Sequence, residues 1–182
     1  MNDDEVQRAT DILLTGGVVA HACEGVWGLA CDAYSFASVQ RILELKHRPI
    51  QHGLILIGDQ AAEFSVELMR LNEEQREEVV NSWPGPETWI LETHRFPAWI
   101  TGGRGTVAVR VPGHEQAREM ARRFGGPLVS TSANRSGEEP GTCQAEVAKS
   151  LGDEVDYLLP GATSGSMGPS RIRVAGSGEV LR

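Results

Sequence analysis

Short apolar segments that alternate with amphipathic ones are the feature that most constrains this fold. The segments expected as strands lie at residues 18–20, 54–58, 88–91, 106–111, 127–129, 155–159, 171–174 and 179–181. Apolar residues recur at helical spacing in residues 4–14, 35–46, 60–70, 114–124 and 144–151, and a capping-box pattern begins a further helix at Asn72. This alternation predicts helices packed on a twisted, mixed, mainly buried β-sheet. We therefore expect one domain of the α/β (α+β) class over residues 1–182.

The connections that leave or enter the predicted strands are the expected location of function. In open α/β sheets, ligands gather at strand ends. We interpret residues 21–32 as a loop that follows the first strand, because glycines at positions 25 and 28 permit tight turns. The segments of interest are GVWGLACD (25–32), GGRG (102–105), STSANRSG (130–137) and GATSGSMG (161–168).

Charge and cysteine usage exclude several classes of protein. The formal net charge is −8, which disfavours sequence-independent nucleic-acid binding and makes any anion site a local feature. No apolar run approaches the roughly 18 residues of a membrane helix, and the acidic N-terminus does not resemble a secretory signal, so we expect a cytoplasmic protein. Three cysteines without CxxC spacing predict reduced thiols.

Hydroxyl and amide side chains follow the apolar strand Pro127-Leu128-Val129. Ser130, Ser132 and Asn134 occupy alternate positions and face one side if strand geometry continues to Asn134. The three side chains would then form a polar wall, and such a wall suits recognition of a phosphate or a sugar. The alternative is a Ser/Thr/Asn turn that caps its own backbone.

Basic side chains provide two further candidates, the pair Lys46 and Arg48 and, separately, Arg110. Lys46 and Arg48 flank the end of a predicted helix and could hold one polyphosphate, although cations at this position also complement the helix dipole. Arg110 lies among valines and alanine in a predicted strand, where a charge should be paired or functional.

Common nucleotide and metal motifs are missing from the sequence. Neither GxxxxGK[ST] nor GxGxxG occurs, and no set of carboxylates or paired cysteines has metal-ligand spacing. Cys23 beside Glu24 is a poor candidate nucleophile, because neighbouring strand side chains point to opposite faces and no histidine is placed by sequence to activate the thiol.

Several motifs together resemble the YrdC-like family, and in particular its short bacterial members. In chain order they are CEGVWGLACD, KHRP with GLILI, WPGPETWIL, VAVRVPGH, PLVSTSANRSG, PSRIR and GEVLR. The resemblance covers about residues 18–182. It implies a twisted mixed sheet with a concave, locally positive cavity. It also implies synthesis of L-threonylcarbamoyl adenylate and pyrophosphate from L-threonine, bicarbonate or CO2, and ATP, for modification of adenosine 37 in tRNA.

The resemblance also implies roles for individual residues. Lys46 and Arg48 would be the catalytic pair on the ATP phosphates. Ser132 and Asn134 would bind phosphate and the Mg2+ that arrives with ATP, with no metal held by protein carboxylates. Ser130 would be a further nucleotide contact. Cys23, Glu24 and Arg110 would form the pocket for threonine and bicarbonate, and Arg110 would also contact ATP. The expected partner is a downstream tRNA threonylcarbamoyl-transfer complex.

The chain departs from the family pattern at three places. His21-Ala22-Cys23-Glu24 replaces a Tyr-Pro-Thr-Glu run, PSRI replaces PSTI, and His52 stands where lysine is common. The chain stops after GEVLR, so we expect no additional C-terminal domain.

Two hypotheses follow from this reading. The first is a synthase in which the basic pair Lys46 and Arg48 faces the serine and asparagine wall across a gap of polyphosphate size. The second is a module that binds double-stranded RNA, tRNA or a ribosomal precursor through a cavity containing Lys46, Arg48, His52 and Arg110.

Overall fold

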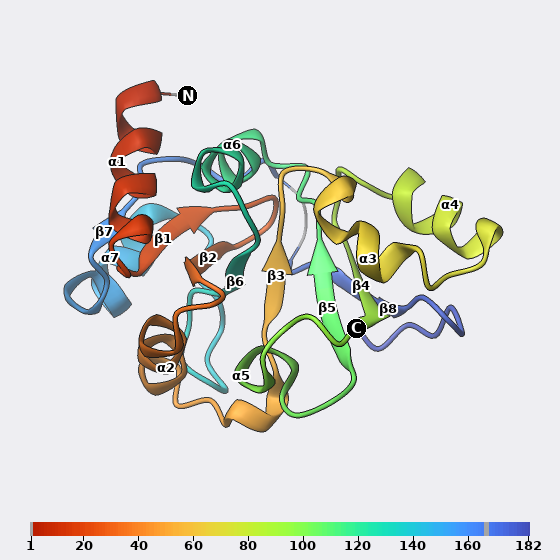
Figure 1. Cartoon of the computed structure of the whole chain (residues 1–182). Helices are drawn as coiled ribbons and strands as arrows, with labels where there is room; N and C mark the ends of the chain where they lie inside the picture. Colours follow the sequence, from red (N-terminus) through yellow and green to blue (C-terminus); the bar gives the residue numbers. More distant parts are fainter. Residues whose placement is uncertain (1, 166–167) are drawn as a thin grey trace.

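A single mixed sheet organises the protein. The computed structural model describes residues 2–165 and 168–182, and its eight strands follow the order β7-β1-β2-β6-β3-β5-β4-β8 (Figure 1). The strands are β1 (Val19–Ala22), β2 (Trp27–Asp32), β3 (Ile55–Ile57), β4 (Glu87–Glu92), β5 (Thr106–Arg110), β6 (Leu128–Ser132), β7 (Tyr157–Leu158) and β8 (Arg171–Val174). Central β6 pairs antiparallel with β2 and β3, whereas β3 pairs parallel with β5 and β4 pairs parallel with β8.

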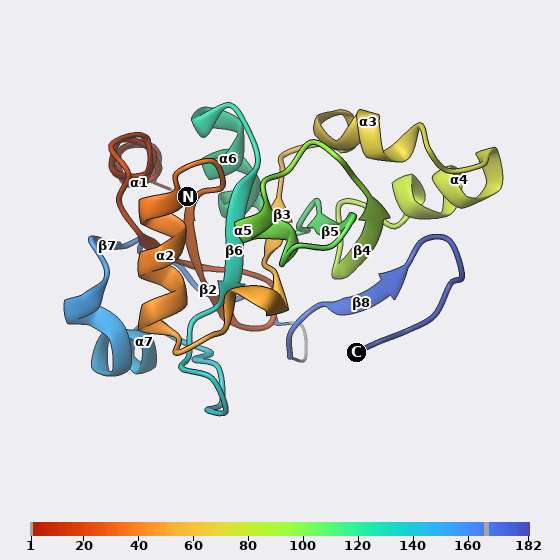
Figure 2. The same cartoon turned by 60° about the horizontal axis from the view of Figure 1, so that its bottom comes forward.

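Helices cover both faces of the sheet. They are α1 (Asp3–Leu14), α2 (Phe36–Leu45), α3 (Ser65–Leu68), α4 (Glu73–Asn81), α5 (Ala98–Thr101), α6 (Glu115–Phe124) and α7 (Gln144–Leu151). Helices α1 and α6 lie together on one face, over β1, β2 and β6, while α2 and α5 lie on the other (Figures 1 and 2).

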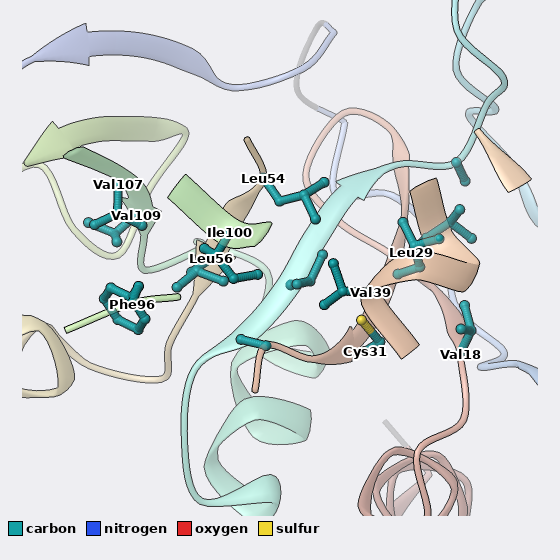
Figure 3. Close-up of a cluster of buried hydrophobic side chains, with 14 of the residues drawn as sticks. Val18, Leu29, Cys31, Val39, Leu54, Leu56, Phe96, Ile100, Val107 and Val109 are labelled. Carbon is teal, nitrogen blue, oxygen red and sulfur yellow. The ribbon is translucent and has the colours of Figure 1, made fainter. Parts of the chain in front are cut away.

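Alternating side chains along the strands divide the core between these two faces. On β2, Leu29 and Cys31 pack toward Val39 of α2, while Ala30 packs in the cluster under α1 and α6. The same larger cluster continues through Leu56 of β3 and reaches β5 and α5 (Figure 3). Because both faces of the central strands bury apolar side chains, the sheet is mainly buried, as the sequence predicts.

Several predicted elements are confirmed with small shifts in their ends. The Ser35 side chain caps α2, and α6 ends at Gly125 in the left-handed conformation. Asn72 and Gln75 form the predicted capping box at the start of α4.

The prediction that residues 21–32 form a loop is wrong over most of its length. Trp27–Asp32 forms strand β2, paired with β1 on one side and β6 on the other. A side-chain Cβ at Gly28 would lie 3.1 Å from His21 Nε2 and 3.2 Å from Ser130 Oγ. The space above this strand position is filled by neighbouring side chains, so a residue without a side chain is needed there, whereas the turn propensity of glycine suggested a loop.

Other expected elements are shorter than predicted. The helix expected over residues 60–70 is a 3₁₀ turn (Ala61–Phe64) followed by α3. The strand expected over 155–159 is reduced to β7, and the one over 179–181 to a single bridge between Arg173 and Val180. Conversely, β6 extends beyond the predicted 127–129 to Ser132, because β2 supplies a pairing partner along its length. The loop predicted at 161–168 lies partly outside the described residues.

Among the helices of residues 2–165 and 168–182, none has the length and apolar character needed to cross a membrane.

The end of α2 yields a prediction about stability. His47 has a φ of 50°, and the amides of His47 and Arg48 donate to the carbonyls of Glu44 and Leu43, at 3.0 and 2.9 Å. This is the hydrogen-bond pattern of a Schellman motif, in which glycine is the usual residue at this left-handed position. We expect His47→Gly to be more stable than the matched His47→Ala by about 1 kcal/mol, because only alanine retains the steric strain. Urea denaturation of both variants measures this difference, and equal stabilities would contradict it.

Candidate functional site

A cavity of about 320 Å³ lies on the sheet face that α1 and α6 cover only in part. Side chains on this face of the central strands form its floor, including Ser130 and Ser132 of β6, Ile55 and Ile57 of β3, and Ala108 and Arg110 of β5. A concave surface with apolar residues and a few convergent polar groups is the usual form of a small-molecule site.

Basic side chains converge on this cavity from separate parts of the chain. Its lining includes Arg48, His52, Arg104, Arg110 and Arg182, and among the described residues that line it none is an aspartate or glutamate. Burial lowers the pKa of Arg48, and the charges of Arg182 and Arg104 lower it further. The cavity is therefore locally positive in a protein whose formal net charge is −8, and an anion would relieve this repulsion.

Arg110 is held rigidly at the inner end of the cavity. Its Nε donates to the Gly85 carbonyl at 2.9 Å, and its Nη2 forms an ion pair with Glu24. Glu24 also accepts hydrogen bonds from the Gly113 amide at 2.5 Å and the Cys23 thiol at 2.9 Å. Burial opposes the charged form of Glu24, but the Arg110 charge and the hydrogen bonds outweigh it and lower its pKa. The predicted trio of Cys23, Glu24 and Arg110 is thus brought together.

Cys23 is a neutral thiol in this arrangement. Burial raises its pKa to about 12, and the thiol donates a hydrogen bond to Glu24. The thiolate is the nucleophilic form of cysteine. The expectation that Cys23 and Glu24 point to opposite faces of a strand is wrong, because β1 ends at Ala22 and the two side chains are hydrogen-bonded.

A second, smaller cavity of about 40 Å³ adjoins the first. Both cavities are lined by Cys23, Val26, Arg110, Pro169 and Ser170, and Glu24 and Pro86 line only the smaller one. It has room for one small molecule beside the ion pair.

Lys46 does not line the cavity, contrary to the expectation that it faces the β6 wall across a gap. Its side chain is only 3% exposed, and its ammonium donates to the carbonyls of Ser132 and Asn134, the latter at 2.7 Å. Burial lowers the pKa of Lys46 to about 8, with a smaller contribution from the Arg48 charge. Lys46 therefore fastens the end of β6, and Arg48 is the member of the pair that reaches the cavity.

Asn134 is separated from the two serines. The predicted wall required strand geometry up to Asn134, but β6 ends at Ser132. The Asn134 amide donates to the carbonyls of Glu138 at 2.6 Å and Arg135 at 2.9 Å, and its Oδ1 accepts from Lys46 at 3.3 Å. This side chain closes its own turn, as the alternative interpretation of the segment proposed.

Two cavity arginines were missed as individual residues. The sequence analysis selected the GGRG loop without selecting Arg104, which lies within it and lines the cavity. No sequence pattern marked Arg182, which also lines the cavity and follows a short terminal segment. Glycines at 102 and 103 with φ of 67° and 77° form the turn before Arg104 and were the available signal for it.

The described residues contain no group of three or more His, Cys, Asp or Glu side chains that could hold a metal ion. The donor set near β6 consists of neutral oxygens, Ser132 Oγ and Asn134 Oδ1, and the latter already accepts from Lys46. These residues fit a divalent ion carried by nucleotide phosphates better than one held by the protein.

Lys46 also yields a prediction. Lys46→Met should lower the free energy of unfolding by ~1–3 kcal/mol at pH 7, because buried carbonyls lose their donor. The folded pKa is depressed, so the unfolded chain binds more protons between about pH 8 and the usual 10.5, and wild-type stability should rise with pH there. Denaturant unfolding at several pH values should show this rise in the wild type relative to Lys46→Met. If the free energy of unfolding changed equally with pH in the wild type and in Lys46→Met, the lowered pKa of a buried Lys46 ammonium would be contradicted.

Comparison with known proteins identifies a family. The sequence model of the Sua5/YciO/YrdC family, described as telomere recombination, matches residues 11–182. The chain is 45% identical to a threonylcarbamoyl-AMP synthase of Halorhodospira halophila over 97% of this chain and 93% of that protein. It is 40% identical to a threonylcarbamoyl-AMP synthase of Hahella chejuensis, over 97% of both chains.

Solved structures agree with this relationship. A crystal structure of P. abyssi Sua5 complexed with L-threonine matches with a TM-score of 0.93 and 29% identity, covering 100% of this chain and 54% of that one. The present chain thus spans about half the length of that protein. The E. coli YciO structure matches with a TM-score of 0.80 at 23% identity, over 95% of this chain and 84% of that one, which shows the shared fold.

Proposed function

Because the chain belongs to the Sua5/YciO/YrdC family, we propose that it is a threonylcarbamoyl-AMP synthase, a nucleotidyltransferase. It would form L-threonylcarbamoyl adenylate and pyrophosphate from L-threonine, bicarbonate or CO2, and ATP. The observation that carries the proposal is the arginine-lined cavity over β6, β3 and β5, which combines excess positive charge with a floor of apolar and hydroxyl side chains.

The triphosphate of ATP is proposed to occupy the basic side of the cavity. Arg48, Arg104 and Arg182 come from three different segments and can each donate to phosphate oxygens. The apolar residues of the floor, among them Ile55, Ile90 and Ala108, would contact the adenine ring. Ser132, at the cavity edge of β6, is proposed as a phosphate contact.

The inner end of the cavity is proposed to bind the other two substrates. Arg110 is oriented by Glu24 and Gly85 and lines both cavities, which suits recognition of a carboxylate or bicarbonate. The adjoining 40 Å³ cavity is of a size for the one-carbon substrate. That P. abyssi Sua5 has been solved in complex with L-threonine supports an amino-acid site in this fold.

The proposed chemistry consists mainly of positioning and charge neutralisation. The threonine amine attacks the carbon of CO2 and loses a proton, or attacks bicarbonate with loss of water, and either route gives a carbamate. A carbamate oxygen then attacks the α-phosphorus of ATP, and the bond to pyrophosphate breaks. Arg48, Arg104 and Arg182 would stabilise the negative charge on the leaving pyrophosphate. No general base is assigned.

Mg2+ is proposed to enter with ATP, where it would neutralise charge on the phosphates. Ser132 lines the cavity and its Oγ could contact the ion, and Asn134 Oδ1 keeps a second lone pair beside the one that accepts from Lys46. In this proposal Lys46 shapes the phosphate site from behind, and it would contact the phosphates only if its bonds to β6 were exchanged.

The product would serve threonylcarbamoylation of adenosine 37 in tRNA by a downstream transfer complex, in the cytoplasm. A module that binds double-stranded RNA is the less favoured alternative, because the curated relatives are named as synthases and the arginines line a cavity instead of an outer surface. Direct contact with tRNA is compatible with either hypothesis.

The proposed function predicts a strict substrate dependence. Pyrophosphate release from ATP should require both L-threonine and bicarbonate, and omission of either should return it to the background rate. A coupled pyrophosphate assay with mass-spectrometric detection of threonylcarbamoyl adenylate measures this. Release of pyrophosphate that needs neither substrate would exclude the proposed reaction.

Arg48 yields a separate prediction. Arg48→Ala should weaken ATP binding by roughly tenfold or more, because a charge-assisted contact contributes ~1.5–3 kcal/mol. Arg76→Ala is the matched control, since Arg76 lies on α4 outside the cavity. Calorimetric titration with ATP should separate the two variants. Equal affinities would place the triphosphate elsewhere.

A further inference from the structure

His21 lies next to the cavity floor and is fully buried. It pairs with Gly28 of β2, which in turn pairs with Ser132 of β6, so these positions share one face of the sheet. The His21 ring extends across the space above Gly28, and its Nε2 lies 3.3 Å from Ser130 Oγ. A histidine on β1 thus reaches a cavity serine two strands away because the intervening residue has no side chain.

The hydrogen bonds of His21 define its tautomer. Its Nδ1 lies 3.0 Å from the Ala22 carbonyl oxygen, which can only accept, so Nδ1 carries the proton. Burial lowers the pKa of His21 to about 4, the Ala22 hydrogen bond opposes this shift, and His114, Glu24 and Arg110 contribute smaller effects. The ring is therefore neutral near pH 7, and Nε2 offers a lone pair.

The Ser130 hydroxyl must then act as the donor to Nε2. A hydroxyl has one proton and two lone pairs, so a serine that donates to histidine has only acceptor capacity for a ligand. Phosphate oxygens that carry no proton cannot fill that role. The ribose of ATP and the amine of threonine can, because both carry protons.

We propose that His21 is a positioning residue that engages the Ser130 proton, so that the Ser130 oxygen accepts a hydrogen bond from an O–H or N–H group of a substrate. The inference rests on the proposed function for the identity of the ligands. It distinguishes Ser130, which would select a donor group, from Ser132, which is proposed to contact phosphate.

A double-mutant cycle tests the coupling. His21→Asn can still donate to Ala22 but is too short to reach Ser130, and Ser130→Ala removes the acceptor itself. Calorimetric affinities for ATP, 2′-deoxy-ATP, 3′-deoxy-ATP and L-threonine would be measured for the wild type, both single variants and the double variant. We expect each single variant to weaken one ligand by about fivefold, the effect of one hydrogen bond, and the double variant to be no weaker than Ser130→Ala.

The ligand whose affinity falls in the His21 and Ser130 variants carries the group that donates a hydrogen bond to Ser130. If it is a ribose hydroxyl, the matching deoxy-ATP should bind the wild type about fivefold more weakly than ATP and should be insensitive to His21→Asn. If it is the amine, L-threonine alone should respond. Either result supports the proposal. Additive effects of the two substitutions, or unchanged affinities for all four ligands in both variants, would overturn it.

Two further variants separate positioning from stability. His21→Gln can place an amide oxygen near the Nε2 position and should restore affinity. Cys31→Ala removes a fully buried group from the opposite face of β2 and should lower the melting temperature without changing any affinity. A loss of affinity in Cys31→Ala equal to that of His21→Asn would also overturn the proposal. These binding measurements need no turnover, so a failure of the synthase assay would be a distinct result.

Discussion

The buried ammonium of Lys46 joins the end of α2 to the end of β6, and the cavity edge depends on this contact. The connection is reciprocal, because the Ser136 amide donates to the Lys46 carbonyl at 2.8 Å and Arg135 donates to the Leu45 carbonyl at 2.9 Å. A charge that is only 3% exposed is stable here because several oxygens surround it. The helix end and the strand end are therefore one unit, which fixes where Ser132 meets the cavity.

Local charge opposes global charge in this protein. The formal net charge of −8 coexists with a cavity whose described lining carries four arginines and no carboxylate. Glu24 pairs with Arg110, so it orients that guanidinium and offsets its charge, while Arg48, Arg104 and Arg182 keep the open cavity positive. Such an arrangement concentrates anions at one place while the outer surface repels polyanions, which is consistent with a nucleotide substrate.

Much of the fold could be predicted because local patterns and tertiary packing agree. Helical spacing, the Ser35 cap and the capping box at Asn72 located α2 and α4 closely. Strand β2 was missed because Gly28 favours turns when read alone. Glycine is needed at this strand position because His21 of the neighbouring strand and Ser130, which is distant in sequence, fill the space above it. The order of the strands was likewise undetermined, since several paired strands, such as β2 and β6 or β3 and β6, are far apart along the chain.

The sequence by itself determined the class of fold, the resemblance to the family and the segments that form the site. Only the tertiary structure decided which side chains reach the cavity. Lys46 and Arg48 are two residues apart, yet one is buried against β6 and the other lines the cavity, because the left-handed turn at His47 redirects the chain between them. Arg104 and Arg182 reach the same cavity as Arg48 because the fold brings together segments that are far apart in the sequence. The spacing of neighbouring residues in the sequence cannot encode such long-range proximity.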